Sequence, residues 1–301
     1  MRTIRTDLAD EAKELFEQRA EKTTALQGLR AREYGRRGCR VTAVEVLDRQ
    51  GSAAIGKPMG RYLTVEVHHG PGAAERFAQE AACIAEELRR LLPAREKEAP
   101  VLVVGLGNRD ITPDAIGPQT VENLLITRHL RTALPEQFSA FTPVCALAAG
   151  VLGETGVESA ELVRGVAEKV KPACVIVVDA LVARRMDRLC ATVQLSDTGL
   201  VPGSGVGNHR SALNEDTLHV PVLSVGVPTV IEAATLAADL LEEGGAEETE
   251  EPFSARFETP FIVTPKDIDT QVRELSRLVG YGINLALQPA LKVEDITAFL
   301  G

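Results

Sequence analysis

Two short runs of apolar residues constrain the fold of this chain more than any other feature of its sequence. The first, Val101–Gly105, reads Val-Leu-Val-Val-Gly, and the second, Ala173–Val178, reads Ala-Cys-Val-Ile-Val-Val. Neither run contains a charged side chain, which is typical of strands that helices cover on both faces of a parallel sheet. Segments with helical periodicity stand between and around the two runs. This order predicts an α/β fold with a mostly parallel, doubly wound sheet and helices on both faces.

The remaining elements follow from apolar periodicity and from turn residues. An amphipathic helix is expected from Asp10 to about Arg30, followed by a small additional strand-containing subregion at 41–47 and 62–68. Further helices are expected at 73–92, 117–130, 158–170, 229–241, 266–287 and 293–300, and further strands at 143–147, 191–195 and 220–225. We expect a single α/β domain over residues 1–301, with an exposed acidic loop at 242–252.

The charge of the chain disfavours a nucleic-acid partner. Its formal net charge is −10, whereas proteins that bind nucleic acid draw most of their affinity from Lys and Arg. Basic residues do cluster at Arg30, Arg32, Arg36, Arg37 and Arg40, but Glu33 interrupts them and no aromatic platform accompanies them. We interpret this cluster as a solvated helix end or an interface.

The cysteine content and the termini indicate a chain that stays in a reducing cytoplasm. The five cysteines are an odd number, lie far apart and form no Cys-x-x-Cys pair, so neither a disulfide framework nor a structural zinc site is expected. The first residues contain no apolar signal region, and no later run approaches membrane-spanning length. We therefore expect no membrane partner.

Two aspartates follow predicted strands, at the positions where a parallel sheet binds its ligands. Asp114 lies between the first apolar run and the helix after it, and Asp179 directly follows the second run. Ligands of open α/β sheets bind beyond the carboxyl ends of the strands. Two carboxyls that meet there can share a proton, one acting as base toward a water molecule and the other as acid. Capping of helices and fixing of loops are the structural alternatives for both residues.

Other kinds of site are less well supported by the sequence. Gly105-Leu106-Gly107 begins like a dinucleotide fingerprint, but Asp110 occupies the place of its third glycine, so no nucleotide cofactor is expected. The glycine-rich run 202–208 is either a structural turn or a substrate loop, and it holds no Gly-x-Ser-x-Gly elbow because Pro202 replaces the first glycine. No His-Glu-x-x-His metal motif is present, and His129 is interpreted as a packed or surface histidine.

Several motifs of this sequence resemble those of the spore germination proteases, a family of atypical aspartic endopeptidases from endospore-forming bacteria. The resemblance rests on Ile4–Ala9, Thr112–Pro118, Val121–Leu130, Val178–Arg184, Ser196–Gly199, Pro202–Asn208 and Gly226–Val230, and it covers most of the chain. It implies a fold similar to that of the hydrogenase maturation proteases. It also implies that the family's two catalytic aspartates correspond to Asp114 and Asp179.

The same resemblance implies a biological role. The family degrades small acid-soluble spore proteins when a spore germinates, so the expected substrates are these proteins and the expected location is the cytoplasm of the forespore or spore core. The family forms homotetramers and is made as a zymogen that removes a short N-terminal propeptide, so residues 1–4 are interpreted as a remnant of such a propeptide. No metal and no cofactor are expected.

The sequence leaves the division of labour between the two carboxyls as a hypothesis. Asp114 precedes a helix, whose N-terminal dipole favours a charged carboxylate, so it is the expected base. Asp179 ends an apolar strand and is the expected acid. Two other functions remain open: a metal-assisted peptidase of the maturation type, and a peptide-binding protein without catalysis on the same fold.

Overall fold

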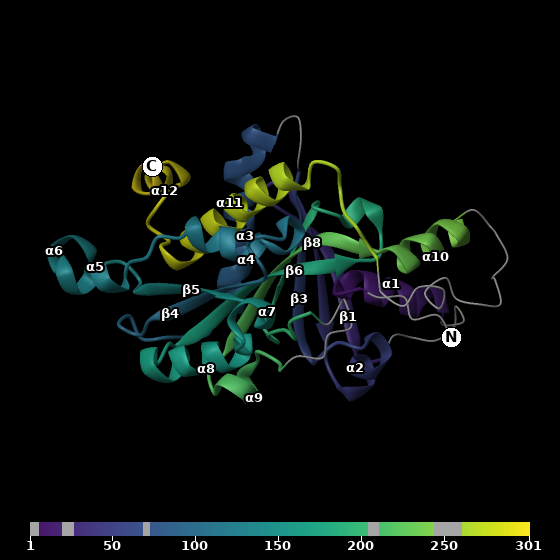
Figure 1. Ribbon diagram of the computed structural model, residues 1–301, viewed down its shortest axis with the longest axis horizontal. Coiled ribbons are helices and arrows are strands. Elements are labelled where there is room, and N and C mark those ends of the chain that lie inside the picture. Colours follow the sequence, from purple (N-terminus) through teal and green to yellow (C-terminus); the bar gives the residue numbers. More distant parts are fainter. Residues whose placement is uncertain (1–5, 20–26, 69–72, 204–210, 244–260) are drawn as a thin grey trace.

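The computed structural model describes residues 6–19, 27–68, 73–203, 211–243 and 261–301. Its centre is one nine-stranded sheet (Figure 1). The strands are β1 (Leu29–Arg36), β2 (Cys39–Val46), β3 (Gly60–Glu66), β4 (Val101–Leu106), β5 (Val144–Gly150), β6 (Cys174–Ala183), β7 (Thr192–Ser196), β8 (Val222–Glu232) and β9 (Ile262–Val263).

Helices connect these strands and cover both faces of the sheet. The α-helices are α1 (Ala9–Arg19), α2 (Arg49–Ile55), α3 (Ala73–Leu91), α4 (Ile116–Glu122), α5 (Arg128–Ala133), α6 (Pro135–Phe138), α7 (Leu152–Thr155), α8 (Ser159–Val170), α9 (Glu215–Leu218), α10 (Ala233–Glu243), α11 (Ile268–Leu287) and α12 (Val293–Leu300). Two short 3-10 helices are η1 (Thr112–Asp114) and η2 (Met186–Arg188). The predicted α/β class with helices on both faces is confirmed, but the sheet is mixed rather than mostly parallel, because β1, β2, β3, β7 and β9 pair antiparallel.

The order of the strands creates a point where the chain changes direction across the sheet. The strands lie in the order β1-β2-β3-β7-β8-β6-β4-β5, and β9 pairs with β8. Neighbouring strands in the segment β5-β4-β6-β8 are parallel, while the remaining pairings are antiparallel. The chain moves from β4 outward to β5 and then returns to β6 on the other side of β4. The topological switch point therefore lies between β4 and β6.

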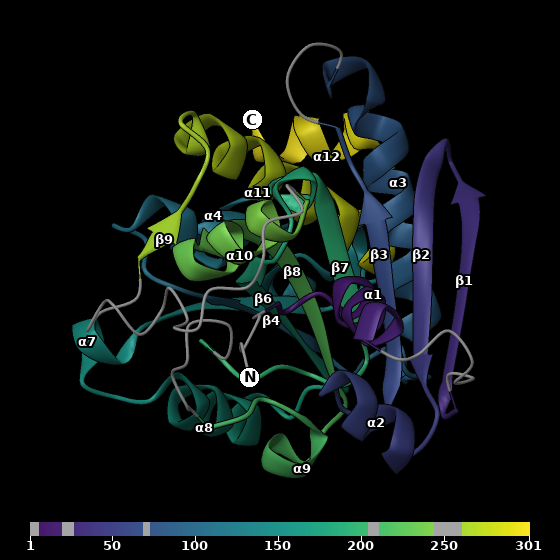
Figure 2. The same ribbon diagram turned by 90° about the vertical axis from the view of Figure 1, so that its right-hand side faces the viewer.

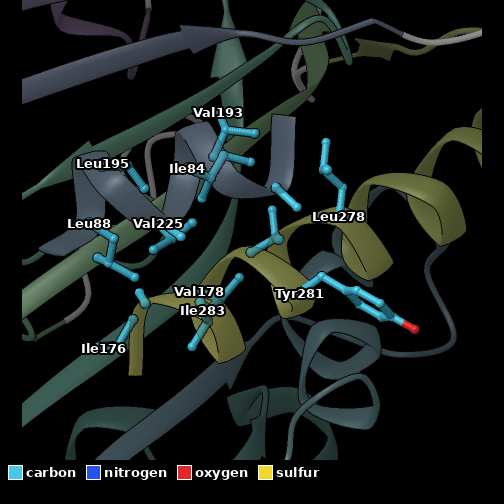
Figure 3. Close-up of a cluster of buried hydrophobic side chains, with 14 of the residues drawn as sticks. Ile84, Leu88, Ile176, Val178, Val193, Leu195, Val225, Leu278, Tyr281 and Ile283 are labelled. Carbon is cyan, nitrogen blue, oxygen red and sulfur yellow. The ribbon is translucent and has the colours of Figure 1, made fainter. Parts of the chain in front are cut away.

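Each face of the sheet has its own hydrophobic cluster. The larger one lies under α3 and α11 and includes Ile84, Ile176, Val178 and Ile283 (Figure 3). On the opposite face, α8 packs over β4 and β6 through residues such as Val163, and α1 and α2 cover β2 and β3. Figure 2 shows α3 and α11 on one side of the sheet and α1, α2, α8 and α9 on the other.

The predicted helix from Asp10 to about Arg30 is confirmed as far as Arg19 and is wrong at its end, because residues from Leu29 onward form a hairpin of β1 and β2. The interpretation of the basic cluster as a helix end is wrong for the same reason. Arg36 and Arg37 instead form ion pairs with Glu86 of α3. The sequence from Leu29 and Ala31 onward does not look like a strand, because β1 is an edge strand that exposes most of its side chains to water and carries several charged residues.

Three other boundaries differ from the sequence prediction. The helix expected at 117–130 consists of α4 and α5, which are separate. The helix expected at 229–241 begins at Ala233, because β8 continues to Glu232, where it pairs with β9. The turn-like segment after Leu47 contains α2, which Asp48 caps by accepting a hydrogen bond from the Gly51 amide at 2.9 Å.

Three segments that the sequence analysis singled out are not covered, or not fully covered, by the described residues. Residues 1–4, most of the glycine-rich run 202–208 and positions 244–252 of the expected acidic loop lie outside the described residues. Among the helices in the described ranges, none is both long and apolar enough to cross a membrane.

Candidate active site

Asp179 lies in β6, immediately after the apolar run that the sequence singles out. Its side chain is 8% exposed, and its Oδ1 atom accepts a hydrogen bond of 2.9 Å from the Ala180 amide. Alternation along β6 places Asp179 on the same sheet face as Val175 and Val177, which pack under α8. The residue opposite it in β8 is Gly226, which adds no polar side chain.

Asp114 is the last residue of η1, the short helix between β4 and α4. Its Oδ2 atom accepts a hydrogen bond of 2.6 Å from the Asn108 amide, just after the end of β4. The bond closes the loop at 107–114 onto the strand end, and the side chain remains half-buried. A second local bond, from the Asp110 amide to Asn108 Oδ1 at 2.7 Å, stiffens the same loop.

A close contact between backbones brings the two aspartate-bearing segments together. Gly117 of α4 lies so close to the sheet that a Cβ atom there would stand 2.2 Å from the Leu106 oxygen and 2.7 Å from the Val178 oxygen. Gly105 on β4 makes the reciprocal approach, with a Cβ at 2.3 Å from the Gly117 oxygen. Only glycine allows this packing. Because Asp114 is three residues before Gly117 and Asp179 directly follows Val178, η1 is held against the part of β6 that carries Asp179.

Asp114, in η1 after β4, and Asp179, within β6, therefore lie beside the topological switch point. This edge of the sheet is where open α/β folds bind their ligands. Within the described ranges, the two aspartates are not part of a group of three His, Cys, Asp or Glu side chains with the spacing of a metal site. Both carboxyls accept hydrogen bonds from nearby backbone amides, which restrict their orientation.

His129 is placed away from this edge of the sheet. His129 is exposed on α5, beside Thr127, whose amide bonds the oxygen of Val144 at the start of β5. It thus lies at the amino ends of the parallel strands, opposite the aspartates. Burial raises the pKa of the Cys174 thiol to about 11 and that of Cys190 to about 12, so neither supplies a thiolate nucleophile at neutral pH.

Sequence reasoning missed the way in which the start of the chain is fixed beside β6. The Asp7 amide donates to the Val182 oxygen at 2.9 Å, and the Val182 amide donates to Asp7 Oδ2 at 3.0 Å. On the same face, Gln194 of β7 accepts from the Ala9 amide at 2.8 Å and donates to the Asp7 oxygen at 3.1 Å. These bonds attach the segment before α1 to the strand that carries Asp179. Ile4–Ala9 and Val178–Arg184 are both motifs of the sequence, but nothing in either indicates that the two segments pair.

Lys57 secures this N-terminal segment from the other side. Its ammonium donates to the oxygens of Thr6 and Asp7 at 3.2 and 2.9 Å, and burial lowers the pKa of Lys57. Replacing it (Lys57→Met) removes two charge-assisted hydrogen bonds while keeping the length of the side chain, so we expect a loss of about 2 kcal/mol in the free energy of unfolding. Urea denaturation measures this loss, and faster hydrogen exchange at the Leu8 and Ala9 amides locates it.

The matched control is Lys13→Met, because among the described residues the Lys13 ammonium bonds only Glu17, on the surface of α1. An exposed pair of this kind contributes about 0.3 to 0.5 kcal/mol. Equal destabilisation by the two substitutions would show that Lys57 does not hold the segment.

The model of one protein family matches most of this sequence. It is described as "Germination protease", and it aligns with residues 8–243. The matched range contains Asp114, Asp179 and both strands that flank the switch point.

Several curated relatives match over almost their whole length. A germination protease of Caldanaerobacter subterraneus subsp. tengcongensis is 42% identical, over 99% of this chain and 98% of its own. Relatives with the same name are 38% identical in Clostridium tetani, covering 99% of each chain, and 35% identical in Bacillus cereus, covering 99% of this chain and 97% of its own. A solved [NiFe] hydrogenase maturation protease, HycI of Thermococcus kodakarensis, covers 65% of this chain and 98% of its own with 16% identity and a TM-score of 0.35, too distant a likeness to bear on the site.

Proposed function

Because this chain belongs to the germination protease family, we propose that it is an endopeptidase that begins the degradation of small acid-soluble spore proteins during germination, with Asp114 and Asp179 as its catalytic pair. Family membership makes the protein a peptidase that acts on protein substrates. The substrate, the location in the forespore or spore core, the homotetramer and the zymogen state belong to the proposal, and the motif resemblance supports them.

One observation supports the catalytic pair above all others. Asp114 and Asp179 come from segments on either side of the switch point, and the packing of Gly117 holds these segments together. An aspartate in an otherwise apolar strand is costly to bury unless it is paired or used. Two acidic residues paired at the ligand-binding edge of a sheet would supply the acid and the base that hydrolysis of an amide requires.

In the proposed reaction the two carboxyls share one proton. Asp114, the more exposed of the two, accepts a proton from a water molecule whose oxygen attacks the carbon of the scissile carbonyl. Asp179, the more buried, holds the shared proton and transfers it toward the leaving amine as the C–N bond breaks. The backbone hydrogen bonds from Asn108 and Ala180 keep both carboxyls in place during these transfers.

The proposal is tested by incubating the purified protein with a small acid-soluble spore protein and identifying the fragments by mass spectrometry. We expect cleavage at a small number of internal bonds, at the same rate with and without EDTA. Loss of cleavage in EDTA that Zn²⁺ or Ni²⁺ restores would instead support the metal-assisted peptidase. Binding of the spore protein without any cleavage, at several pH values, would support the binding protein without catalysis.

A further inference from the structure

The two outer edges of the sheet differ in how they are protected. At one end, β1 exposes Arg30, Arg32 and Glu33, and such charges prevent an edge strand from pairing with other chains. At the other end, β5 reads Val-Cys-Ala-Leu-Ala-Ala-Gly and carries neither a charge nor a proline. An uncharged edge strand can pair with a further strand. The edge of β5 is therefore open to such pairing, whereas the charges of β1 oppose it.

The hydrogen-bond pattern shows which residues of β5 face outward. The Val101 amide of β4 donates to the Pro143 oxygen, whereas the Pro100 oxygen accepts from Ala173 on the side of β6. Backbone groups alternate between the two sides of a strand. Cys145 and Leu147 therefore turn their amides and carbonyls toward β4.

The alternate residues, Val144, Ala146 and Ala148, turn theirs away from the sheet. The first of these positions already has a strand-like partner. The Thr127 amide donates to the Val144 oxygen at 3.1 Å, and the Val144 amide donates to Thr127 Oγ1 at 2.9 Å. At the far end, Ser159 Oγ donates to the Gly150 oxygen at 3.2 Å.

Between these two ends, the outward amides and carbonyls of Ala146 and Ala148 have no hydrogen-bond partner within the described part of the chain. Ala148 is exposed and Ala146 half-buried, and neither methyl group blocks the approach of another strand. The gap thus offers two donors and two acceptors to an extended backbone.

This gap is continuous with the candidate active site. Ala148 is level with Gly105 of β4, and Gly105 is level with Val178, the residue before Asp179. Adjacent strands are about 4.8 Å apart, so a chain paired with the outer edge of β5 lies roughly 15 Å from β6. An extended chain advances about 3.3 Å per residue, so roughly five residues bridge that distance.

We propose that the outer edge of β5 is a substrate-docking site, where an extended segment of the protein substrate pairs through its backbone with Ala146 and Ala148, roughly five residues from the bond that is cut. This inference rests on the proposed function. Because β5 offers backbone groups and small side chains, the docked segment is selected for extended conformation and small residues rather than for charge.

The test is Ala148→Pro, with Ala148→Val as the matched control. Proline removes the outward amide and is tolerated at a sheet edge, whereas valine adds similar bulk and keeps the amide. We expect proline to raise KM for an intact small acid-soluble spore protein about fivefold, the effect of one lost hydrogen bond, with kcat unchanged. Cleavage of an eight-residue peptide centred on the cut bond is expected to remain at the wild-type rate, because it does not reach β5.

Binding gives a readout that does not depend on turnover. In an Asp179→Ala background, fluorescence anisotropy of the labelled spore protein is expected to show the same fivefold weakening with proline and no change with valine. Equal affinity of all three proteins would overturn the docking site even if the protein proves to be an active protease. A change in oligomeric state on light scattering with proline, at unchanged affinity, would also overturn it and assign the β5 edge to contacts between copies of this chain.

Discussion

Replacing either aspartate of the pair by asparagine is expected to reduce kcat for spore-protein cleavage by roughly 10³-fold or more, with the fold retained. Asparagine has the shape of aspartate and still accepts the hydrogen bonds from Asn108 or Ala180, but it neither takes up nor gives away a proton. Single-turnover rates of Asp114→Asn and Asp179→Asn measure the effect. Because both carboxyls act in the same proton transfers, the double variant is expected to be little slower than either single variant.

Asp187→Asn provides the control for these substitutions. Asp187 lies on η2, accepts hydrogen bonds from the exposed Arg185 side chain and is itself exposed, so its replacement is expected to leave kcat unchanged. Near-wild-type turnover by either Asp114→Asn or Asp179→Asn, with circular dichroism unchanged in all variants, would rule out the shared-proton mechanism.

Gly117→Ala is expected to have the second large effect, on both stability and activity. The added methyl group would stand 2.2 Å from the Leu106 oxygen and 2.4 Å from the Leu106 nitrogen, and these backbone atoms belong to β4 and cannot give way. We expect a loss of about 2–3 kcal/mol in the free energy of unfolding, as for other overpacked interiors. Moving α4 away from the sheet also moves Asp114 away from Asp179, so kcat is expected to fall about 10²-fold.

The same exchange at Gly165 is the matched control. Gly165 is an exposed position within α8, and a Cβ atom there would meet nothing within 4 Å. Alanine in a helix is more favourable than glycine by roughly 0.5–1 kcal/mol, so Gly165→Ala is expected to raise stability and to leave activity alone. Urea denaturation and turnover of the two variants are to be compared side by side. A Gly117→Ala protein as stable and active as wild type would show that the close contact does not position the pair.

Sequence reasoning found the centre of the molecule because apolar runs there are unambiguous. The strands around Val103 and Ile176 are covered on both faces, so they form continuous apolar runs that are easily recognised as buried strands. The placement of an aspartate after each run then located the edge of the sheet at which a site is expected. The catalytic role of Asp114 and Asp179 stays a prediction until it is measured.

The parts that sequence reasoning missed depend on contacts between distant segments. β1 shows charges to solvent, and only its pairing with β2 makes it a strand. β8 continues to Glu232 because β9, some thirty residues later, supplies a partner. Gly117 looked like an ordinary residue of a helix, since its need to be glycine comes from Leu106 and Val178 on two other elements. None of these constraints is local, so none appears in a window of sequence.

The order of strands across the sheet also bears on how this protein is made. The antiparallel strands β1, β2 and β3 can pair early during synthesis. The other edge of β3, however, pairs with β7, where Tyr62 lies opposite Ser196. Until the ribosome has released β7, the growing chain presents the unpaired edge of β3 to its surroundings. Sheets closed by such long-range pairings fold slowly, and unpaired edges are prone to aggregate. We therefore expect the nascent chain to be most prone to aggregation before the second half of the protein emerges.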